Sequence, residues 1–304
     1  MNRLTAVLSA GLLFIGISLA MAQDKPLADE TKGQAQIDKK SVSQSEGRKK
    51  DLEKLKEESN ERTNMIKKKL PRTINQIKDW IKENKFPPYQ SEIFSDLARI
   101  DNDQRVFDIY CEIIENTSDI RAKLSAIAGM KHINNKTAIP TLGKALSDKS
   151  IFVRCAAADT LFSWGEKDIV YPIYIEIMNR EDLENQLDKE IPEKLKQIGF
   201  GADKSNSDWE LYSYRVKIGI IAPMLENILT YDKSEVKKLI TGIVKKKKTV
   251  SLIEKYIELD SERLEQQKKK YPDWEGYKLQ EDYLKTMKNL IEKINKIESE
   301  VKIK

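Results

Sequence analysis

The fold is decided by one stretch of the sequence, Ser147-Asp148-Lys149-Ser150-Ile151-Phe152-Val153-Arg154-Cys155-Ala156-Ala157-Ala158-Asp159-Thr160-Leu161. A polar turn leads directly into a helix whose first turns are rich in alanine, and small residues there let neighbouring helices approach closely. A preceding copy runs from Ile120 to Met130 and continues through Thr137-Ala138-Ile139-Pro140-Thr141-Leu142-Gly143-Lys144-Ala145-Leu146, about 31 to 33 residues earlier in the chain. Self-similarity at such a period predicts stacked helical hairpins, that is, an α-solenoid.

The repeat carries particular residues at its turns. Ala138-Ile139-Pro140 is followed by Asp148 and Arg154, and then by Ala156-Ala157-Ala158 and Leu161. This stretch resembles the HEAT-like repeats of bacterial proteins, including the repeats of the phycobilisome lyase group. The resemblance implies that Pro140 bends a helix, and that Asp148 and Arg154 tie successive turns together by hydrogen bonds.

The second copy keeps only part of this pattern. Pro172 corresponds to Pro140, but Arg180 and Gln186 stand where the first copy has its aspartate and arginine. We therefore expect the hydrogen-bonded ladder to lapse there. The clear match covers residues 120–178 only, and short helical repeats of this kind occur in proteins with many unrelated functions. The resemblance thus implies structural roles and no particular chemistry.

These patterns together predict an all-α protein, an α-solenoid of stacked HEAT-like hairpins with a long C-terminal capping helix. The expected domains are a secretory signal peptide (1–22), a disordered or charged helical leader (23–70), the solenoid (71–260) and a helical cap (261–304). Within the leader, residues 23–50 are rich in lysine, aspartate, glutamine, serine and glycine. Such a segment buries too little apolar surface to offset the entropy of ordering it.

The N-terminus has the features of a bacterial secretory signal. Arg3 supplies the positive charge, Leu4–Ala20 the apolar run, and Ala20-Met21-Ala22 a cleavage site of small residues. We predict cleavage before Gln23 and a periplasmic or secreted product. An uncleaved anchor is the alternative, because the run approaches the length that spans a bilayer. No later segment is apolar enough to cross a membrane, and the absence of a cysteine after the cut argues against a lipoprotein.

The charge balance gives little indication of a nucleic-acid partner. The chain has 54 basic and 49 acidic residues and a formal net charge of +5, with 34% charged and 39% hydrophobic residues. This composition is expected of thin helical layers with a large solvated surface. Export from the cytoplasm argues further against nucleic acid.

Few residues support a metal or nucleophilic site. His132 is the only histidine, and we interpret it as a capping or exposed residue at a helix end. Repeat-built di-iron hydroxylases resemble this architecture but need several histidine and glutamate pairs, which a chain with one histidine cannot supply. Cys111 and Cys155 leave three alternatives open, namely two buried thiols, a disulfide in an oxidising compartment, or a redox or metal role. The chain lacks G-x-S-x-G and a phosphate-binding glycine loop, and we expect no metal and no cofactor.

Apolar spacing predicts the remaining helices. A first packed helix is expected beyond Pro71, and a break at Pro87-Pro88. Further elements are predicted at 90–100, 103–116, 181–199 with an interruption near Pro192, 209–231 with a bend near Pro223, 234–259 as a faint hairpin, and 277–302. The last helix has a seam at Tyr283, Met287, Leu290, Ile294, Ile297 and Val301, which predicts either a coiled coil with another helix or a cap on the solenoid.

We predict binding rather than catalysis. The second helices of the two copies, at 138–147 and 168–178, are expected to form a concave protein-docking surface, with Lys144 and Glu176 as candidate contacts. A second candidate is an anion-binding lysine run, with ordinary solvation as the alternative; its residues are Lys245, Lys246, Lys247 and Lys248, assisted by Lys67–Lys69 and Lys268–Lys270. A third is a set of aromatic residues able to stack on a sugar or a peptide, with core anchoring as the alternative; its residues are Trp209, Tyr212, Tyr214 and Tyr271–Tyr277.

The expected function is that of an exported scaffold that binds another protein of the cell envelope. The alternative is an enzyme or enzyme subunit, lyase-like or hydrolase, that acts on an envelope substrate. It would use acidic residues near the loop at 199–215, because loops mounted on rigid scaffolds often carry function.

Overall fold

The protein is all-helical in the part of the chain that its computed structural model describes, which confirms the predicted helical class. These residues are 39–87, 90–100, 103–133, 135–180, 182–197, 207–231, 234, 242, 248–272 and 276–302. They divide between two compact units at Asn135 and Lys136. The predicted signal peptide, the loop at 199–206 and Lys245–Lys247 lie outside the described residues. Among the described helices, none combines the length and apolar character that a membrane crossing requires.

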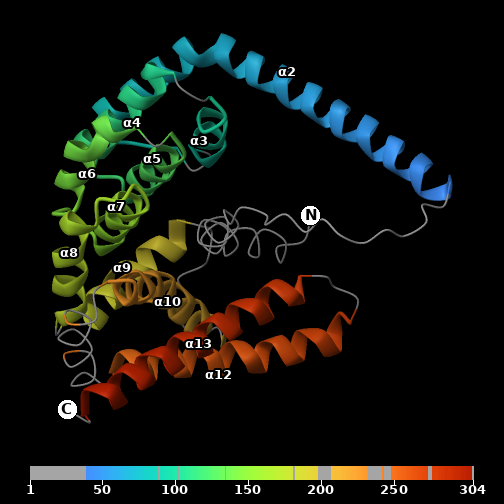
Figure 1. Ribbon diagram of the computed structural model, residues 1–304. Coiled ribbons are helices and arrows are strands. Elements are labelled where there is room, and N and C mark those ends of the chain that lie inside the picture. Colours follow the sequence, from blue (N-terminus) through green and yellow to red (C-terminus); the bar gives the residue numbers. More distant parts are fainter. Residues whose placement is uncertain are drawn as a thin grey trace. The chain divides into compact units, whose positions relative to one another are not determined.

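In its described residues, the N-terminal unit has four helices (Figure 1), which are α2 (Lys39–Glu83), α3 (Gln90–Leu97), α4 (Gln104–Asn116) and α5 (Ile120–Ile133). α4 and α5 form the most extensive pair, while α2 packs against α3 and α4, and α3 packs against α5. Fully buried side chains fill the space between them, among them Leu70, Ile77, Leu97, Tyr110 and Met130. His132, in the last turn of α5, is exposed as expected.

The helix α2 is continuous where the sequence suggested a boundary. It begins at Lys39, inside the segment expected to be a leader, and passes through Pro71. A proline inside a helix lacks one backbone donor and costs about 3 kcal/mol. Leu70 and Ile77, on either side of Pro71, are both completely buried. The packing of these side chains offsets the loss of the backbone bond, so the helix does not end there.

The end of α2 is fixed by a left-handed residue. Asn84 has φ +48°, its amide donates to the Ile81 carbonyl at 3.0 Å, and the Lys85 amide donates to the Trp80 carbonyl at 3.0 Å. This pair of bonds is the Schellman motif, in which the residue after the cap takes the left-handed conformation. Trp80 also packs edge-on against Phe86, with ring centroids 5.8 Å apart.

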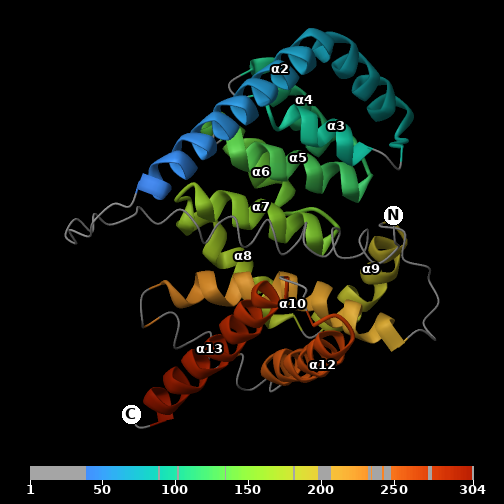
Figure 2. The same cartoon turned by 90° about the vertical axis from the view of Figure 1, so that its right-hand side faces the viewer.

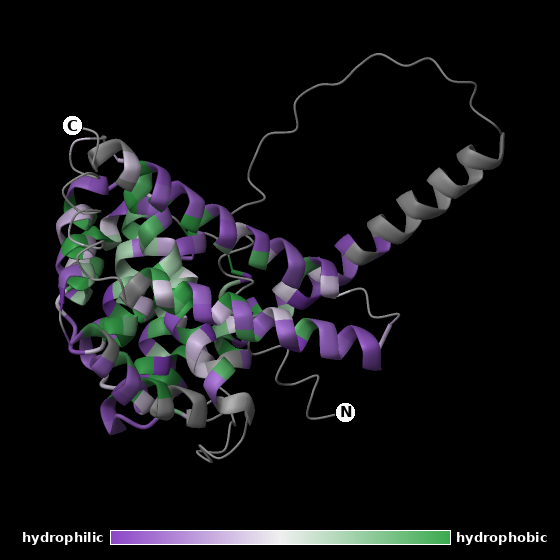
Figure 3. Ribbon diagram, turned by 90° about the horizontal axis from the view of Figure 1, so that it is seen from below, coloured by the Kyte–Doolittle hydropathy of each residue, from purple (hydrophilic) through white to green (hydrophobic). Residues whose placement is uncertain are grey.

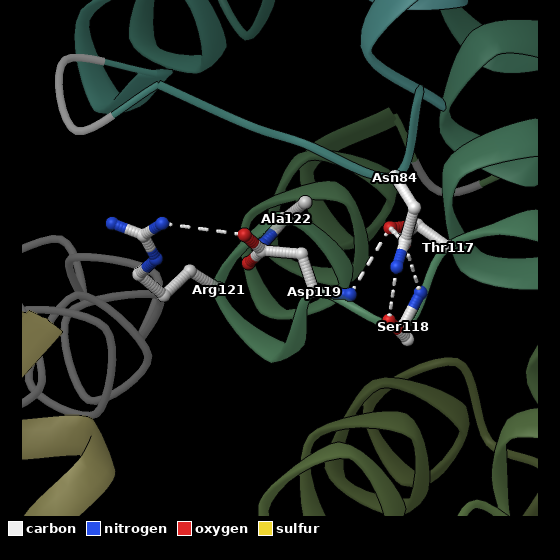
Figure 4. Close-up of polar contacts among 6 residues, drawn as sticks. All are labelled: Asn84, Thr117, Ser118, Asp119, Arg121 and Ala122. Carbon is white, nitrogen blue, oxygen red and sulfur yellow. Dashed lines mark hydrogen bonds and ion pairs between the residues drawn. The ribbon is translucent and has the colours of Figure 1, made fainter. Parts of the chain in front are cut away.

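The side chain of Asn84 attaches the end of α2 to the loop before α5 (Figure 4). Its Oδ1 accepts from the Thr117 hydroxyl at 3.0 Å and from the Ser118 amide at 2.9 Å, while its Nδ2 donates to the Ser118 hydroxyl at 2.6 Å. The same loop caps α5, because Asp119 Oδ1 accepts from the Ala122 amide at 3.0 Å. Asn84 therefore meets two requirements, a left-handed backbone and three hydrogen bonds.

Replacing Asn84 with alanine is expected to lower the free energy of unfolding by about 1 to 2 kcal/mol, because both requirements are lost. Replacement with glycine keeps the backbone conformation and loses only the side-chain bonds, so it should cost about half as much. Urea unfolding followed by circular dichroism would compare the two variants. Equal losses in both would show that the left-handed conformation contributes nothing.

The C-terminal unit is arranged around α10 (Figure 2). Its helices with described bounds are the short η1 (Lys136–Ala138), α6 (Ile139–Ala145), α7 (Ile151–Ser163), α8 (Lys167–Asn179), α9 (Leu183–Gln197), α10 (Ser207–Leu229), α12 (Lys248–Lys270) and α13 (Tyr277–Lys302). α10 contacts α7, α8, α9, α12 and α13. The alanine-rich helix predicted from Ile151 is α7, and it is buried almost throughout.

Prolines act differently here from what the sequence suggested. Pro140 stands at the first turn of α6, where a missing amide hydrogen leaves no bond unmade, so it starts a helix rather than bending one. Pro192 lies inside α9, which runs without the predicted interruption. Pro172 and Pro223 are inside α8 and α10.

The C-terminal helix is the prediction that agrees best with the structure. α13 spans the predicted residues 277–302, and its seam residues Met287, Leu290 and Ile294 are buried. The seam packs within the chain, against α12 and α10. Figure 3, coloured by hydropathy, shows hydrophobic residues gathered where helices pack and hydrophilic residues on their outer turns.

The two cysteines are both thiols. Cys155 is buried, and its sulfur lies 3.8 Å from the sulfur of Met224. Cys111 is only partly buried. Of the three alternatives that the sequence leaves open, the structure has the two thiols, although Cys111 is less enclosed than expected.

Candidate functional site

Arg154, which the sequence led us to expect would tie successive turns together, connects three helices of the C-terminal unit. From α7, its Nε donates to the Leu146 carbonyl at the end of α6 (2.8 Å), and its Nη2 donates to Glu176 Oε2 on α8 (2.7 Å). The arginine is buried, whereas the glutamate is largely exposed. Glu176, predicted as a contact for a partner, therefore already holds an internal cation, and this bond fixes where its carboxylate lies.

The polar residues near the start of α7 cap that helix. Asp148 Oδ1 accepts from the Ser150 amide at 2.8 Å, and Glu190 of α9 accepts from the Ser150 hydroxyl at 2.7 Å and the Ile151 amide at 3.3 Å. Carboxylates at a helix N-terminus satisfy amides that have no partner within the helix, and they also complement the helix dipole. Asp148 therefore has a local capping role.

Arg180 and Gln186 make hydrogen bonds of another kind. Arg180 donates two hydrogen bonds to Asp182, at 2.9 and 2.8 Å. Gln186 donates to the Lys149 carbonyl at 3.3 Å and to Glu190 at 2.9 Å. These bonds differ from those that Asp148 and Arg154 make.

One face of α8 exposes two apolar residues, and we name it the α8 face. Ile169 is 42% exposed, and Pro172 and Glu176, three and seven residues later, are exposed as well. Residues at this spacing lie on one face of a helix. Lys144 is exposed on α6. α8 therefore presents apolar side chains to solvent beside a carboxylate whose position is fixed.

Several of the aromatic candidates belong to one helix. Trp209 and Tyr212 lie in α10, and Tyr214 is partly exposed on the same helix. The Lys217 ammonium lies 5.7 Å from the centroid of the Tyr214 ring and 2.7 Å from Asp188 Oδ1. Tyr214 is thus engaged with an internal cation.

The aromatic turn near residue 271 joins α12 to α13. Tyr277 is buried, and its hydroxyl lies 2.7 Å from the carbonyl oxygens of Gln267 and Tyr271. Tyr271 is exposed, with the Lys270 ammonium 5.4 Å from its ring centroid. Lys248 is the first residue of α12. The turn therefore anchors one tyrosine in the hairpin and leaves the other at the surface.

A buried polar cluster joins α7, α8 and α10. The Tyr174 hydroxyl donates to Asp159 Oδ1 at 2.5 Å and accepts from Asn227 Nδ2 at 3.0 Å. Burial, reinforced by the Asp159 charge, raises the pKa of Tyr174 far above its ordinary value. The phenol therefore stays protonated and serves as a hydrogen-bond donor that holds the helices together.

A second cluster joins α10 to α12 around a carboxylate with no exposed surface. Asp260 Oδ1 accepts from Arg215 Nε at 3.1 Å and also from Arg215 Nη2, while Oδ2 accepts from the Tyr256 hydroxyl at 3.0 Å. Asp260 is 0% exposed. Burial and the Asp260 charge raise the pKa of Tyr256 well above its ordinary range. The buried charge is thus paired and hydrogen-bonded, as a buried ion must be.

The N-terminal unit has a cavity between α2 and α3, which we name the α2–α3 groove. Its volume is about 170 Å³, and it is lined by Arg62, Met65, Ile66, Lys69 and Thr73 of α2 and by Ile93, Asp96 and Leu97 of α3. Arg62 Nη2 donates to Asp96 Oδ1 at 3.2 Å and so links the two helices. Met65 is 59% exposed. The groove thus combines an apolar floor with charged edges.

In the described part of the chain, no three histidine, cysteine, aspartate or glutamate side chains gather as ligands of a metal ion would. Comparisons with protein-family models, with curated proteins and with solved structures found no match to this chain. The candidates for function are therefore the two surfaces just described, the α8 face and the α2–α3 groove. Sequence reasoning missed the groove, because the apolar residues near Met65 are too irregularly spaced to define a core face.

Proposed function

We propose that this chain is an exported, non-enzymatic scaffold whose helical hairpins stack in the HEAT-like manner and bind another protein of the cell envelope. The observation that carries the proposal is the α8 face, where Ile169 and Pro172 are exposed to solvent. The resemblance of residues 120–178 to HEAT-like repeats supports this choice, because such repeats bind partners with the surface of their second helices.

The internal hydrogen bonds favour binding over the alternative, an enzyme that acts near residues 199–215. Arg215, at the end of that range, is joined to buried Asp260, and Lys217 is paired with Asp188. Two acidic residues that pack against α10, Asp188 of α9 and Asp260 of α12, thus serve ion pairs between helices. The α8 face has the opposite character, since its apolar side chains contact solvent.

Replacing Ile169 with lysine is expected to weaken partner binding about tenfold, because a charge would replace the larger of the two exposed apolar side chains of the α8 face. The immobilised chain Gln23–Lys304 would capture its partner from envelope extract at low and at high salt, and mass spectrometry would identify what is retained. The affinity of the purified partner would then be measured for each variant.

Leu279→Lys is the matched control, because Leu279 of α13 is 45% exposed and lies outside the α8 face. This control should bind the partner as the unmodified chain does. Retention of no protein at either salt concentration, or equal binding by Ile169→Lys, would contradict the proposal and favour a small-molecule or glycan ligand.

A further inference from the structure

The α2–α3 groove has a basic edge. Lys68, Lys69 and Arg72 follow Met65 by three, four and seven residues, so they lie on the same side of α2. All four residues are exposed, and Lys69 also lines the groove. The lysine run that the sequence analysis noted at 67–69 therefore stands beside an apolar cavity.

The charge along this edge is of one sign. No acidic residue lies between Arg62 and Thr73 in the sequence. On the α3 side, Asp96 is neutralised by Arg62. Glu61, one turn before Met65, is the nearest carboxylate on the same face of α2. The field near Lys68, Lys69 and Arg72 is therefore positive, and it attracts an anionic ligand.

The floor of the groove is suited to apolar side chains. Ile66, Ile93 and Leu97 line it, and Met65 stands at its rim with more than half of its surface in water. Methionine adapts its shape to different partners, because its side chain is flexible and polarisable. A purely ionic ligand would leave this apolar surface uncovered.

We propose that the α2–α3 groove binds an amphipathic helix of a partner protein, with leucine-like side chains on the floor and glutamate or aspartate opposite the basic edge. A helix laid in a groove is a recurrent mode of recognition, and its anchors repeat every three to four residues. A second copy of α2 fits less well, because it would bring Lys68, Lys69 and Arg72 against the same residues. This surface lies in the N-terminal unit and is independent of the α8 face.

The probe is a capped peptide of about 15 residues, roughly four helical turns, with leucine on one face and glutamate on both flanks. A matched peptide carries lysine in place of glutamate. Fluorescence anisotropy would measure the binding of each peptide to the chain Gln23–Lys304 at about 50 mM and about 500 mM salt. At low salt, the acidic peptide is expected to bind at least about tenfold more tightly than the lysine peptide. Its own affinity is expected to fall at high salt.

Variants locate the binding. The double change Lys68→Glu and Lys69→Glu should weaken the acidic peptide about tenfold, and Met65→Ser about fivefold. The pair Lys82→Glu and Lys85→Glu makes the same charge change at exposed positions outside the groove. This control should stay within about twofold of the unmodified chain.

Equal binding of the two peptides, binding of neither, or an equal effect of the control pair would overturn the proposal. Sedimentation velocity addresses the second-copy alternative, because a dimer that Met65→Ser dissociates would place a second chain in the groove and also overturn it. A membrane ligand would also overturn the proposal. It would be indicated if the chain bound vesicles of anionic phospholipid, the double variant did not, and the acidic peptide failed to bind. None of these outcomes depends on Ile169, so the groove and the α8 face can fail separately.

Discussion

Replacing Arg215 with methionine is expected to lower the free energy of unfolding by about 3 to 5 kcal/mol, because it leaves a buried carboxylate without its cation. Asp260 has no exposed surface, so water cannot take the place of the guanidinium. Of the two side chains that donate to Asp260, Tyr256 would remain. One neutral donor compensates only part of the cost of burying a charge. Urea unfolding of the chain, followed by circular dichroism, measures the loss.

Two further variants make this expectation specific. Arg180→Met breaks the ion pair with Asp182, in which both side chains reach solvent, so it should cost less than about 1 kcal/mol. The double variant Arg215→Met and Asp260→Leu removes both charges and should recover most of the loss, because apolar side chains often replace a buried pair well. A loss at Arg215 no larger than that at Arg180 would show that the Asp260 charge is not buried in solution.

Replacing Gly129 with alanine is expected to cost about 2 to 3 kcal/mol, because the new methyl group would overlap the ring of Tyr110. It would lie 2.6 Å from the hydroxyl oxygen and closer still to two ring carbons. Tyr110 cannot easily move, since it has no exposed surface and its ring stacks on Phe94 at a centroid distance of 6.2 Å. The contact joins α4 to α5, the most extensive helix pair of the N-terminal unit.

Gly143→Ala is the matched control for this change. Gly143 also lies inside a helix, α6, but no atom stands within 4 Å of an added methyl group. Alanine is the better helix former by about 0.5 to 1 kcal/mol, so this variant should be slightly more stable than the unmodified chain. Thermal unfolding of both variants measures the contrast. Similar behaviour of the two would mean that the α4–α5 contact is looser than described.

The elements that the sequence placed well are those whose apolar spacing is regular over many residues. The seam from Met287 to Ile294 defined α13, and the alanine-rich run after Ile151 defined α7. In both helices the local pattern and the packing require the same face. Boundaries were less predictable, because Pro71 breaks an isolated helix but is tolerated in α2, where residues distant in sequence cover its neighbours.

The polar contacts were harder to predict, because each depends on a partner far along the chain. Asp260 falls on the apolar face of α12 with Ile253, Tyr256 and Leu264, which signals a buried carboxylate. Nothing in the sequence points to Arg215 as its cation. The same holds for Asn84, whose partners in the loop before α5 become neighbours only when α4 has folded back.

Because α2 is one continuous helix, it fixes the distance between its first residue and the α2–α3 groove. A helix rises about 1.5 Å per residue, so its first residue, Lys39, stands about 35 Å along the axis from Arg62 at the edge of the groove. A flexible tether of the same number of residues would sample many shorter spans. A continuous helix instead keeps one length, so the distance from Lys39 to the groove is set by the number of residues between them. Adding or deleting two helical turns within it would change that distance by about 11 Å without altering the packed helices.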